Sequence, residues 1–317
     1  MNNVVNDFSH ASVLADETVS FVADVNATVI VDATLGLGGH TELMLAALPQ
    51  ATVIGIDQDT AAIEIAEKRL SIFGNRFSAV HGNFSTIADV VGTRGLSGVD
   101  AIIADLGVSS LQFDDVSRGF SFRFDAPLDM RMDGASDRPT AAELIENTPE
   151  SELADIIYQY GEERASRRIA RWIAERNERG EPITTTRELA ELVERAVKRG
   201  KNDKIHPATR TFQALRIAVN GELDILEKFL TDSVNCLNEN GVLAVISFHS
   251  LEDRIVKRTF QRLSGKCECP PRMPVCQCGA VKLVEILTRK PIAPSEDEMR
   301  ENPRSRSAKL RVCRKLI

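Results

Sequence analysis

The sequence predicts an α/β fold, namely a doubly wound, mostly parallel sheet with an inserted all-helical domain. Three observations support this prediction. Short apolar runs alternate with helical stretches between residues 28 and 115, and a glycine-rich turn follows the first run. After Asp105 the next strongly apolar run begins only at Val242. The 137 residues between them (242 − 105 = 137) far exceed the roughly a dozen that a strand crossover needs.

The first third of the chain shows repeated strand–helix pairs. We expect strands at residues 28–31, 52–56, 77–80 and 101–104, and helices at 41–48 and 61–70. Pro49 ends the first of these helices, and Gly74 closes the second. Apolar strands that alternate with helices indicate βαβ units, and therefore a parallel sheet covered on both faces.

The pattern changes after the fourth strand. Residues 113–140 hold four phenylalanines without clean periodicity, and we interpret them as a long functional loop. The chain is then helical. Three helix starts are recognisable: capping boxes at Thr140 with Glu143 and at Thr185 with Glu188, and Thr148 as an N-cap before Pro149. We therefore place an inserted helical domain at 113–209.

The sheet pattern returns towards the end of the chain. Residues 208–219 and 223–237 are expected to be helices, Asn240-Gly241 is expected to turn the chain, and residues 242–248 form the fifth strand. The predicted core is thus discontinuous, and it comprises residues 1–112 and 210–317.

Charge is unevenly distributed along the chain. The formal net charge is −7, and residues 1–100 hold twelve Asp or Glu against four Lys or Arg. Residues 195–216 and 300–317 each hold seven basic residues against one acidic residue, a net of +6 in each. These two segments are either surfaces that meet phosphates or solvated helix faces and a basic tail. With no membrane-length apolar run and no secretory signal, we expect a cytoplasmic protein with reduced thiols and no membrane partner.

The glycine-rich turn is typical of nucleotide-like ligands. It reads Gly36-x-Gly38-Gly39, and Asp57 ends the next strand 21 residues after the first glycine (57 − 36 = 21). Glycines allow close backbone approach, the helix start presents free N–H groups, and an acidic residue at this spacing holds ribose hydroxyls. The dinucleotide spacing Gly-x-Gly-x-x-Gly is absent, so a nicotinamide-dependent oxidoreductase is the alternative rather than the first choice. His40 either caps the helix or contacts the cofactor.

Asp105 is our candidate for the catalytic residue. It ends the fourth strand, as Asp32 and Asp57 end the first and second, and ligands of open α/β sheets bind at the carboxyl ends of strands. An exocyclic base amine has a delocalised lone pair, and an acceptor that holds its hydrogens would orient it towards an electrophilic methyl group. The other interpretation is an Asp that caps the next turn. His249 follows the fifth strand and is expected on the same rim, where Ser250 and Asp253 could start a helix.

The chain resembles the ribosomal RNA small-subunit methyltransferase H family, the cytosine-amine methyltransferases. The resemblance rests on stretches spread over nearly the whole chain: 10–14, 32–40, 105–110, 119–122, 127–132, 160–164, 206–216, 247–254 and 302–307. Two positions depart from the family pattern, Leu111 in place of proline and Ala126 in place of glycine. Both lie in loops, so they bear on loop shape more than on chemistry.

The resemblance implies a Rossmann-like methyltransferase core with an inserted substrate-recognition domain. It implies methyl transfer from S-adenosylmethionine to the exocyclic amine of one cytosine in the decoding region of small-subunit (16S) ribosomal RNA, met as rRNA or as a 30S particle. By matching position, the cofactor contacts would be Gly38, Gly39, His40, Asp57, Phe84, Asp105 and Gln112. The candidate substrate contacts are Ser109, Ser110, His249, Arg304 and Arg306. Phe84 either stacks on adenine or packs in the core.

Four of the six cysteines form two Cys-x-Cys pairs, Cys267 with Cys269 and Cys276 with Cys278. They could hold a structural zinc ion, although zinc sites more often have wider spacing within each pair, or they could be reduced thiols of a surface loop. A second alternative for the whole chain is a non-catalytic RNA-binding protein that retains the fold. The intact turn with Asp57 and Asp105 argues against it.

Overall fold

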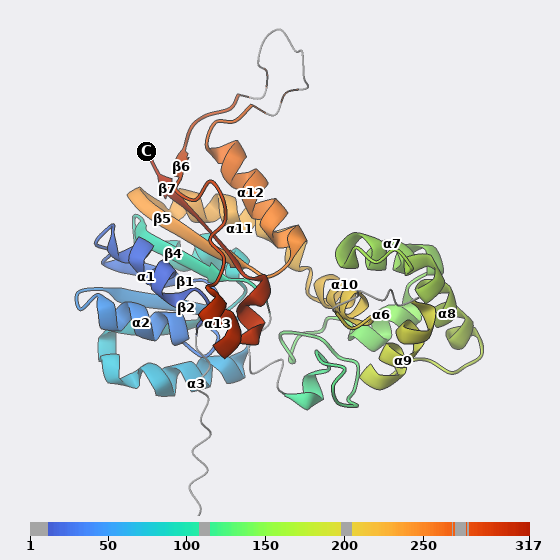
Figure 1. The fold of residues 1–317 in the computed structure, drawn as a ribbon. Helices are drawn as coiled ribbons and strands as arrows, with labels where there is room; N and C mark the ends of the chain where they lie inside the picture. Colours follow the sequence, from blue (N-terminus) through green and yellow to red (C-terminus); the bar gives the residue numbers. More distant parts are fainter. Residues whose placement is uncertain (1–11, 108–114, 198–204, 268, 270–276, 278) are drawn as a thin grey trace, which may run out of the picture. The chain divides into compact units, whose positions relative to one another are not determined.

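The structure is a computed structural model that describes residues 12–107, 115–197, 205–267, 269, 277 and 279–317. The chain forms two compact units (Figure 1). The larger unit comprises residues 1–107 and 225–317, and the smaller comprises residues 108–224. The smaller unit therefore interrupts the sequence of the larger one. It extends beyond the 113–209 assigned from the sequence, because the helix at 209–220 packs within it.

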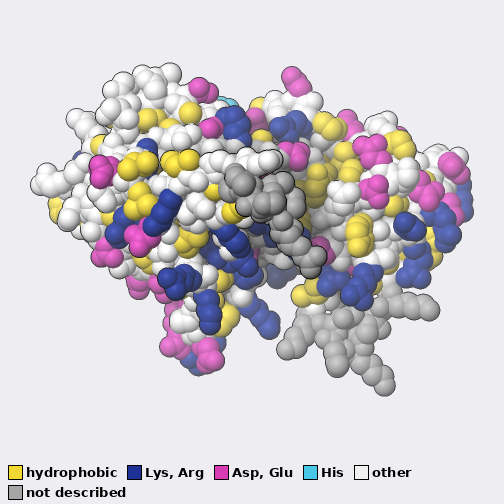
Figure 2. Space-filling model, turned by 90° about the horizontal axis from the view of Figure 1, so that it is seen from above, with side chains coloured by type: hydrophobic (Ala, Val, Ile, Leu, Met, Phe, Trp, Pro, Cys, Tyr) yellow, Lys and Arg dark blue, Asp and Glu magenta, His cyan; other side chains and the backbone are white. Residues whose placement is uncertain are grey.

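The surface carries charged side chains in groups. On the face shown in Figure 2, Lys and Arg side chains gather in some places, and Asp and Glu side chains in others. In the part of the chain that the structure describes, no helix combines the length and the apolar character needed to cross a membrane.

The larger unit is built around one sheet. Its elements up to the fourth strand are α1 (Ala15–Ala23), β1 (Val29–Asp32), α2 (Gly39–Ala47), β2 (Thr52–Asp57), α3 (Thr60–Leu70), η1 (Ser71–Arg76), β3 (Phe77–His81), η2 (Phe84–Thr86), α4 (Ile87–Thr93) and β4 (Val99–Asp105). Those after the smaller unit are α11 (Glu222–Cys236), β5 (Leu237–Ser247), α12 (Ser250–Leu263), β6 (Val284–Ile286), α13 (Glu296–Glu301), η4 (Pro303–Ser307) and β7 (Lys309–Lys315).

The sheet has seven strands in the order β3-β2-β1-β4-β5-β7-β6. The first five are parallel, whereas β7 runs antiparallel to both β5 and β6. The predicted doubly wound, mostly parallel sheet is therefore confirmed. The strand order reverses between β1 and β4, and in such sheets ligands bind beyond the carboxyl ends of the strands at this point.

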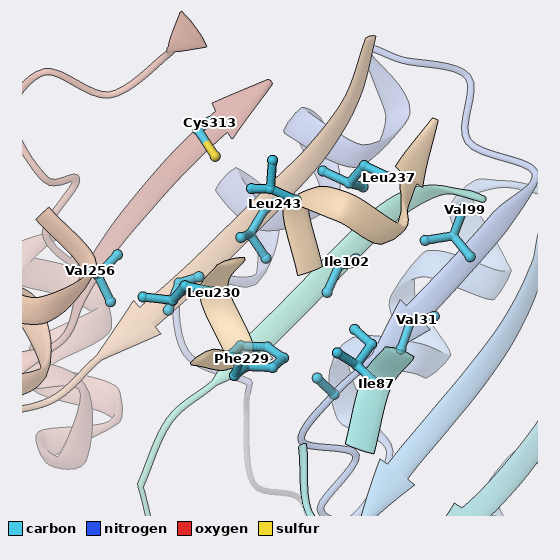
Figure 3. Close-up of a cluster of buried hydrophobic side chains, with 14 of the residues drawn as sticks. Val31, Ile87, Val99, Ile102, Phe229, Leu230, Leu237, Leu243, Val256 and Cys313 are labelled. Carbon is cyan, nitrogen blue, oxygen red and sulfur yellow. The ribbon is translucent and has the colours of Figure 1, made fainter. Parts of the chain in front are cut away.

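Alternate side chains of each strand point into two separate cores. Ile30, Ile103 and Leu310 belong to the core that includes α1, α2 and α3, whereas Val31 and Ile102 belong to the core that includes α4, α11 and α12. Figure 3 shows the second core from close by. Because both faces are covered, the strands are apolar on both sides, as the sequence pattern indicated.

The structure corrects two sequence predictions for the last third of the chain, one about β5 and one about the segment 300–317. β5 begins at Leu237 and continues through Asn240-Gly241, where the register with β4 shifts and Asn240 has φ 66°, so this pair does not reverse the chain. The segment considered as a basic tail contains β7, whose Leu310, Val312 and Cys313 are fully buried. An antiparallel strand that comes from far along the chain leaves no local helix–strand pattern to detect.

The smaller unit is helical, with η3 (Val116–Arg118), α6 (Ala141–Asn147), α7 (Glu150–Gly161), α8 (Ser166–Glu178), α9 (Thr186–Ala196) and α10 (Thr209–Asn220). Both predicted capping boxes are present, at Thr140 and Thr185. The expected N-cap at Thr148 is wrong, because Pro149 itself precedes α7 and Thr148 ends α6. α7 and α10 pack closely, since a Cβ on Gly161 would lie 2.5 Å from the carbonyl oxygen of Arg210.

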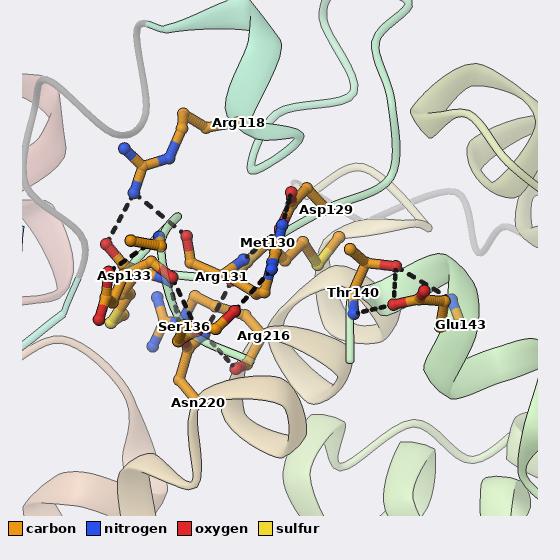
Figure 4. A network of polar contacts seen from close by, with 12 residues as sticks. Arg118, Asp129, Met130, Arg131, Asp133, Ser136, Thr140, Glu143, Arg216 and Asn220 are labelled. Atoms are coloured by element: carbon orange, nitrogen blue, oxygen red, sulfur yellow. Dashed lines mark hydrogen bonds and ion pairs between the residues drawn. The ribbon is translucent and has the colours of Figure 1, made fainter. Parts of the chain in front are cut away.

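A polar network holds the loop before α6 (Figure 4). We call Arg118, Asp129, Arg131 and Asn220 the loop network. Arg131 binds both carboxylate oxygens of Asp129 at 2.8 and 2.9 Å, and Arg118 donates to the carbonyls of residues 131 and 132. The Asn220 side chain donates to the Met130 carbonyl at 2.9 Å, which fixes Met130 in the left-handed region at φ 64°.

Candidate active site

The glycine-rich turn lies between β1 and α2 as predicted. Gly36 and Gly38 have φ of 52° and 78°, a region that favours glycine, and Gly38 is the N-cap of α2. The Gly38 N–H donates to the Leu35 carbonyl at 2.8 Å, which closes the turn. Among the described residues, a Cβ on Gly36 would meet only the Thr34 carbonyl within 4 Å, at 3.9 Å. The described part of the chain therefore leaves space beside this part of the turn.

Packing within the protein leaves little room for a side chain at Gly38 or Gly39. A Cβ on Gly38 would lie 2.9 Å from Leu70 of α3, and a Cβ on Gly39 would collide with the Ser12 hydroxyl. From the sequence we attributed these glycines to the close approach of a ligand. The structure supplies a sufficient reason within the chain, so their contact with a cofactor stays a prediction.

Asp57 connects the second strand to the turn. Its Oδ2 accepts the N–H of Gly36 at 2.7 Å, and its Oδ1 accepts the N–H of Asp59 at 2.9 Å. Burial raises the pKa of Asp57, although these backbone hydrogen bonds oppose the rise. Each carboxylate oxygen can accept a second hydrogen bond, so Asp57 can hold the turn and still receive hydroxyl groups of a ligand.

His40 is a buried, neutral side chain. Its Nε2 lies 3.0 Å from the Val13 carbonyl, which can only accept, so Nε2 carries the hydrogen and Nδ1 is unprotonated. Burial lowers the pKa of His40 to about 4. Nδ1 is 3.9 Å from Asp105 Oδ2, a distance compatible with an ion pair, but the neutral imidazole leaves the carboxylate uncompensated at neutral pH.

Asp105 has a hydrogen-bonded backbone N–H, but one of its carboxyl oxygens has no hydrogen-bond partner among the described residues. Its backbone N–H donates to the Thr34 hydroxyl at 2.6 Å, which ties the end of β4 to the glycine-rich turn. The side chain as a whole is 28% exposed, yet its Oδ1 is buried and has no hydrogen-bond partner among the described residues. Burial, and then the charges of Asp32 and Glu252, raise the pKa of Asp105 well above its usual range.

Asp32 is the most deeply buried of the three carboxylates beside the turn. It is 1% exposed, and it accepts hydrogen bonds from the Thr41 hydroxyl at 2.7 Å and the Thr34 N–H at 3.2 Å. Burial raises the pKa of Asp32 to about 6 despite these bonds. We call Asp32, His40, Asp57 and Asp105 the strand-end site.

His249 precedes α12, which begins at Ser250 as one interpretation of the sequence allowed, with Asp253 in its first turn. His249 is the N-cap in a capping box with Glu252, whose Oε2 accepts the N–H groups of Phe248 and His249 at 2.8 and 3.3 Å. Glu252 is 2% exposed and lies close enough to Asp105 to affect its pKa. The sequence argument missed this role of Glu252, although its place three residues after His249 fits a capping box.

Phe84 packs in the core of the larger unit. Its ring meets the ring of Phe229 in α11 edge-on, with centroids 4.9 Å apart, and it stays half-buried. The core interpretation thus accounts for one side of the ring, and adenine contact stays a prediction. Ser109, Ser110 and Gln112, the other expected contacts near β4, lie outside the described residues.

The two candidate RNA contacts near the carboxyl terminus lie in η4. Arg306 is exposed, whereas Arg304 is partly buried and its N–H donates to the Asn302 side chain at 3.2 Å. Lys309, the next basic residue, has an assigned partner, because its Nζ lies 3.3 Å from Asp253 Oδ2. The basic segment is therefore partly structural.

In the described half of the cysteine cluster, both sulfur atoms have backbone hydrogen-bond partners. Cys267 and Cys269 form no disulfide, and each sulfur accepts a backbone N–H, from Cys269 at 3.4 Å and from Gln277 at 3.3 Å. Among the residues that the structure describes, no group of three or more His, Cys, Asp or Glu side chains is placed to hold a metal. Cys276 and Cys278 lie outside those residues, so zinc stays a prediction.

The sheet order and the carboxylates at three strand ends define a doubly wound α/β protein with a candidate ligand site beside β1, β2 and β4. Residues 7–316 match the model of the MraW methylase family, and the chain belongs to that family. A relative from Geobacter sp. (strain M21), named ribosomal RNA small subunit methyltransferase H, is 50% identical over 313 residues, which are 98% of this chain and 99% of the relative.

A relative of the same name from Clostridium botulinum (strain 657 / Type Ba4) is 50% identical over 311 residues, which are 98% of this chain and 100% of the relative. A solved structure described as an rRNA methylase from Streptococcus thermophilus aligns over 95% of each chain with 12% identity and a TM-score of 0.43. The family resemblance derived from the sequence stretches is confirmed by the family match and these relatives.

Proposed function

We propose that the chain transfers a methyl group from S-adenosylmethionine to the exocyclic amine of one cytosine in the decoding region of small-subunit (16S) ribosomal RNA. The observation that carries the proposal is the buried, unpartnered Oδ1 of Asp105 beside the glycine-rich turn. A buried oxygen without a partner costs free energy, so its retention at a strand end points to a ligand donor. The names of the relatives indicate the class of methyl acceptor, which is small-subunit ribosomal RNA.

The residues of the strand-end site fit the cofactor. The open space beside Gly36 can receive a ligand, and Asp57 retains acceptor capacity for ribose hydroxyls. His40 is held by Val13 at the start of α2, where the helix presents N–H groups. When bound, S-adenosylmethionine supplies an electrophilic methyl group to the site.

Asp105 would orient and deprotonate the acceptor amine. Its Oδ1 accepts one amine hydrogen, which turns the nitrogen lone pair away from the carboxylate and fixes its direction. As the bond between the nitrogen and the methyl carbon forms, the bond from that carbon to the sulfonium sulfur would break and leave a neutral thioether. The nitrogen becomes positively charged and must lose a proton. The raised pKa suits the Asp105 carboxylate to take that proton. Asp32 and Glu252 favour the protonated form because a proton removes a like charge.

We infer that the smaller unit recognises the RNA substrate, together with the basic residues of η4. An enzyme that modifies one base must meet that base unstacked, and it holds the rest of the RNA largely through phosphates. Arg304 and Arg306 supply such charges in the larger unit. The segment 195–216, with its net of +6, supplies them in the smaller unit.

The nearest competing function is a nicotinamide-dependent oxidoreductase, and titration calorimetry separates the two. We expect the protein to bind S-adenosylmethionine, and to give no heat with NADH. Asp57→Ala should weaken binding of S-adenosylmethionine at least 10-fold, since it removes the acceptor for ribose. Asp89→Ala, an exposed carboxylate in α4, is the matched control and should bind as the wild type does. Binding of NADH but not of S-adenosylmethionine would overturn the proposal.

A further inference from the structure

A pocket with a basic lining lies in the larger unit, between α12 and the strands at the edge of the sheet. It has a volume of about 170 Å³, which exceeds the space of a single water molecule several-fold. Its lining is formed by Lys257, Phe260 and Gln261 from α12, Ile286 from β6, Arg289, and Arg311 from β7. It shares no residue with the strand-end site.

Arg311 is the anchored charge of this pocket. Its side chain is only 8% exposed, and its Nε donates to Asp253 Oδ1 at 2.7 Å. Its two terminal nitrogens make no hydrogen bond with any described residue, although the side chain lines the pocket. A guanidinium held by Nε presents its remaining donors in a fixed, planar arrangement.

Asp253 does not neutralise the pocket. Burial alone would raise the pKa of Asp253, but Arg311 and Lys309 outweigh burial and lower it, so this carboxylate stays charged. Its single negative charge is shared between these two cations.

Two further cations complete the lining. Lys257 and Arg289 are exposed, and neither forms an ion pair or hydrogen bond with the side chains that the structure describes. The lining thus contains three cations, Lys257, Arg289 and Arg311. In the described part of the chain, the one carboxylate that contacts them, Asp253, also pairs with Lys309. Glu285 precedes Ile286 in β6, and because side chains alternate along a strand it points to the other face.

We propose that this pocket, defined by Lys257, Gln261, Arg289 and Arg311 and called the basic pocket below, binds a backbone phosphate of the RNA substrate. Guanidinium groups match the geometry of phosphate oxygens, and an unneutralised cation cluster attracts a phosphodiester. The inference rests on the proposed function for the identity of the ligand as RNA.

The position of the basic pocket along α12 fits this role. His249 is the N-cap of α12 at the rim of the strand-end site, and Lys257 follows eight residues later. At about 1.5 Å per residue, roughly 12 Å of helix separates the two. A phosphate bound there would fix the path of the RNA strand next to the base without reading its sequence.

The test is the salt dependence of RNA binding by the double variant Lys257→Gln/Arg289→Gln. Both side chains are exposed, so we expect the variant to fold normally. With a single-stranded oligoribonucleotide of mixed sequence, the slope of log affinity against log salt should fall by about 0.7 for each phosphate that the variant no longer binds. The KM for small subunits should rise several-fold while kcat stays within two-fold of the wild type. The charge-conserving variant Lys257→Arg/Arg289→Lys should retain most of the slope.

The control variant is Lys68→Gln/Arg94→Gln, which makes the same charge change after β2 and β3, at the opposite edge of the sheet. A slope equal to that of the wild type in Lys257→Gln/Arg289→Gln, or equal losses in both double variants, would overturn the inference. Loss of inorganic phosphate binding without a change in slope would assign the pocket to free phosphate and equally overturn it. Methyl transfer is scored separately, so failure of the proposed reaction remains distinguishable.

Discussion

The strand-end site and the loop network differ in whether their charged side chains have partners of opposite charge. In the loop network of the smaller unit, Asp129 and Arg131 bind each other through two hydrogen bonds. Burial alone would raise the pKa of Asp129, but Arg131 outweighs it and lowers the pKa. In the strand-end site no cation compensates Asp32 or Asp105 among the described residues, and burial raises the pKa of both.

This difference separates structural charges from charges available for chemistry. A carboxylate whose pKa is lowered by an adjacent guanidinium stabilises the folded state and is a poor proton acceptor. A buried carboxylate with a raised pKa costs stability, and it gains a partner only when a ligand arrives. The three predictions that follow concern buried charges with and without a partner of opposite charge, beginning with the largest expected effect.

Asp105→Ala should abolish methyl transfer, with a loss of about 1,000-fold or more in kcat, because it removes both the acceptor for the amine and the proton acceptor. Single-turnover transfer of labelled methyl groups to small subunits measures the loss. Calorimetric binding of S-adenosylmethionine and thermal unfolding check that the variant is intact. Normal methylation by a folded Asp105→Ala protein would show that the unpartnered oxygen has no role in the reaction.

Arg216→Ala should destabilise the smaller unit by about 3 kcal/mol, because it leaves the carboxylate of Glu222 without its bidentate ion pair. The two side chains are 15% and 10% exposed, and their bonds are 2.9 and 2.8 Å long. The single tryptophan, Trp172, lies in α8, so its fluorescence during denaturant unfolding reports on this unit.

Arg171→Ala is the matched control for that variant. Arg171 pairs with Glu175 on an exposed face of α8, where the side chains are 56% and 46% accessible. We expect a loss below about 0.5 kcal/mol there. Equal losses for Arg171→Ala and Arg216→Ala would contradict the view that the smaller unit depends on paired, half-buried charges.

Asp32→Asn should change the pH dependence of stability. The folded-state pKa of Asp32 is raised to about 6, so the folded protein binds a proton that the unfolded chain has released, and wild-type stability falls as pH rises from about 4 to 6. His40 acts in the opposite direction: its folded-state pKa is about 4, so its contribution is present above its unfolded pKa and is lost as pH falls towards 4.

Only the Asp32 contribution disappears in Asp32→Asn. The free energy of unfolding of the variant, relative to the wild type, should therefore rise by about 2 to 3 kcal/mol between pH 4 and pH 7. Denaturant unfolding followed by far-ultraviolet circular dichroism at several pH values measures it. If the difference in the free energy of unfolding between Asp32→Asn and the wild type did not depend on pH, burial would not raise the pKa of Asp32.

The sequence predicted those features of the fold that are decided locally. The first four strands follow from runs of buried residues, and the capping boxes at Thr140 and Thr185 follow from hydrogen bonds within one helical turn. The two strands beyond β5, namely β7 and β6, were not predicted. β7 pairs with β5 across a large sequence separation, and its alternation of basic and buried residues resembles a charged tail until that pairing is known.

The sequence predicted which residues form the candidate site, but it did not predict the burial and the neighbouring charges of these residues. Asp32, Asp57 and Asp105 do end neighbouring strands, because the carboxyl ends of parallel strands meet at one edge. The neutral state of His40 depends on burial, and Glu252 reaches Asp105 from a position 147 residues further along the chain (252 − 105 = 147). Neither has a signal in the local sequence.

The most direct test of the account is transfer of labelled methyl groups from S-adenosylmethionine to small ribosomal subunits isolated from cells that lack this protein. The modified nucleotide is then mapped and its methyl position determined. The account predicts one labelled site, a cytosine of the decoding region carrying the methyl group on its exocyclic amine, and no label with Asp105→Ala. Label on a ring carbon or a ribose hydroxyl, or no label from the wild-type protein, would contradict it.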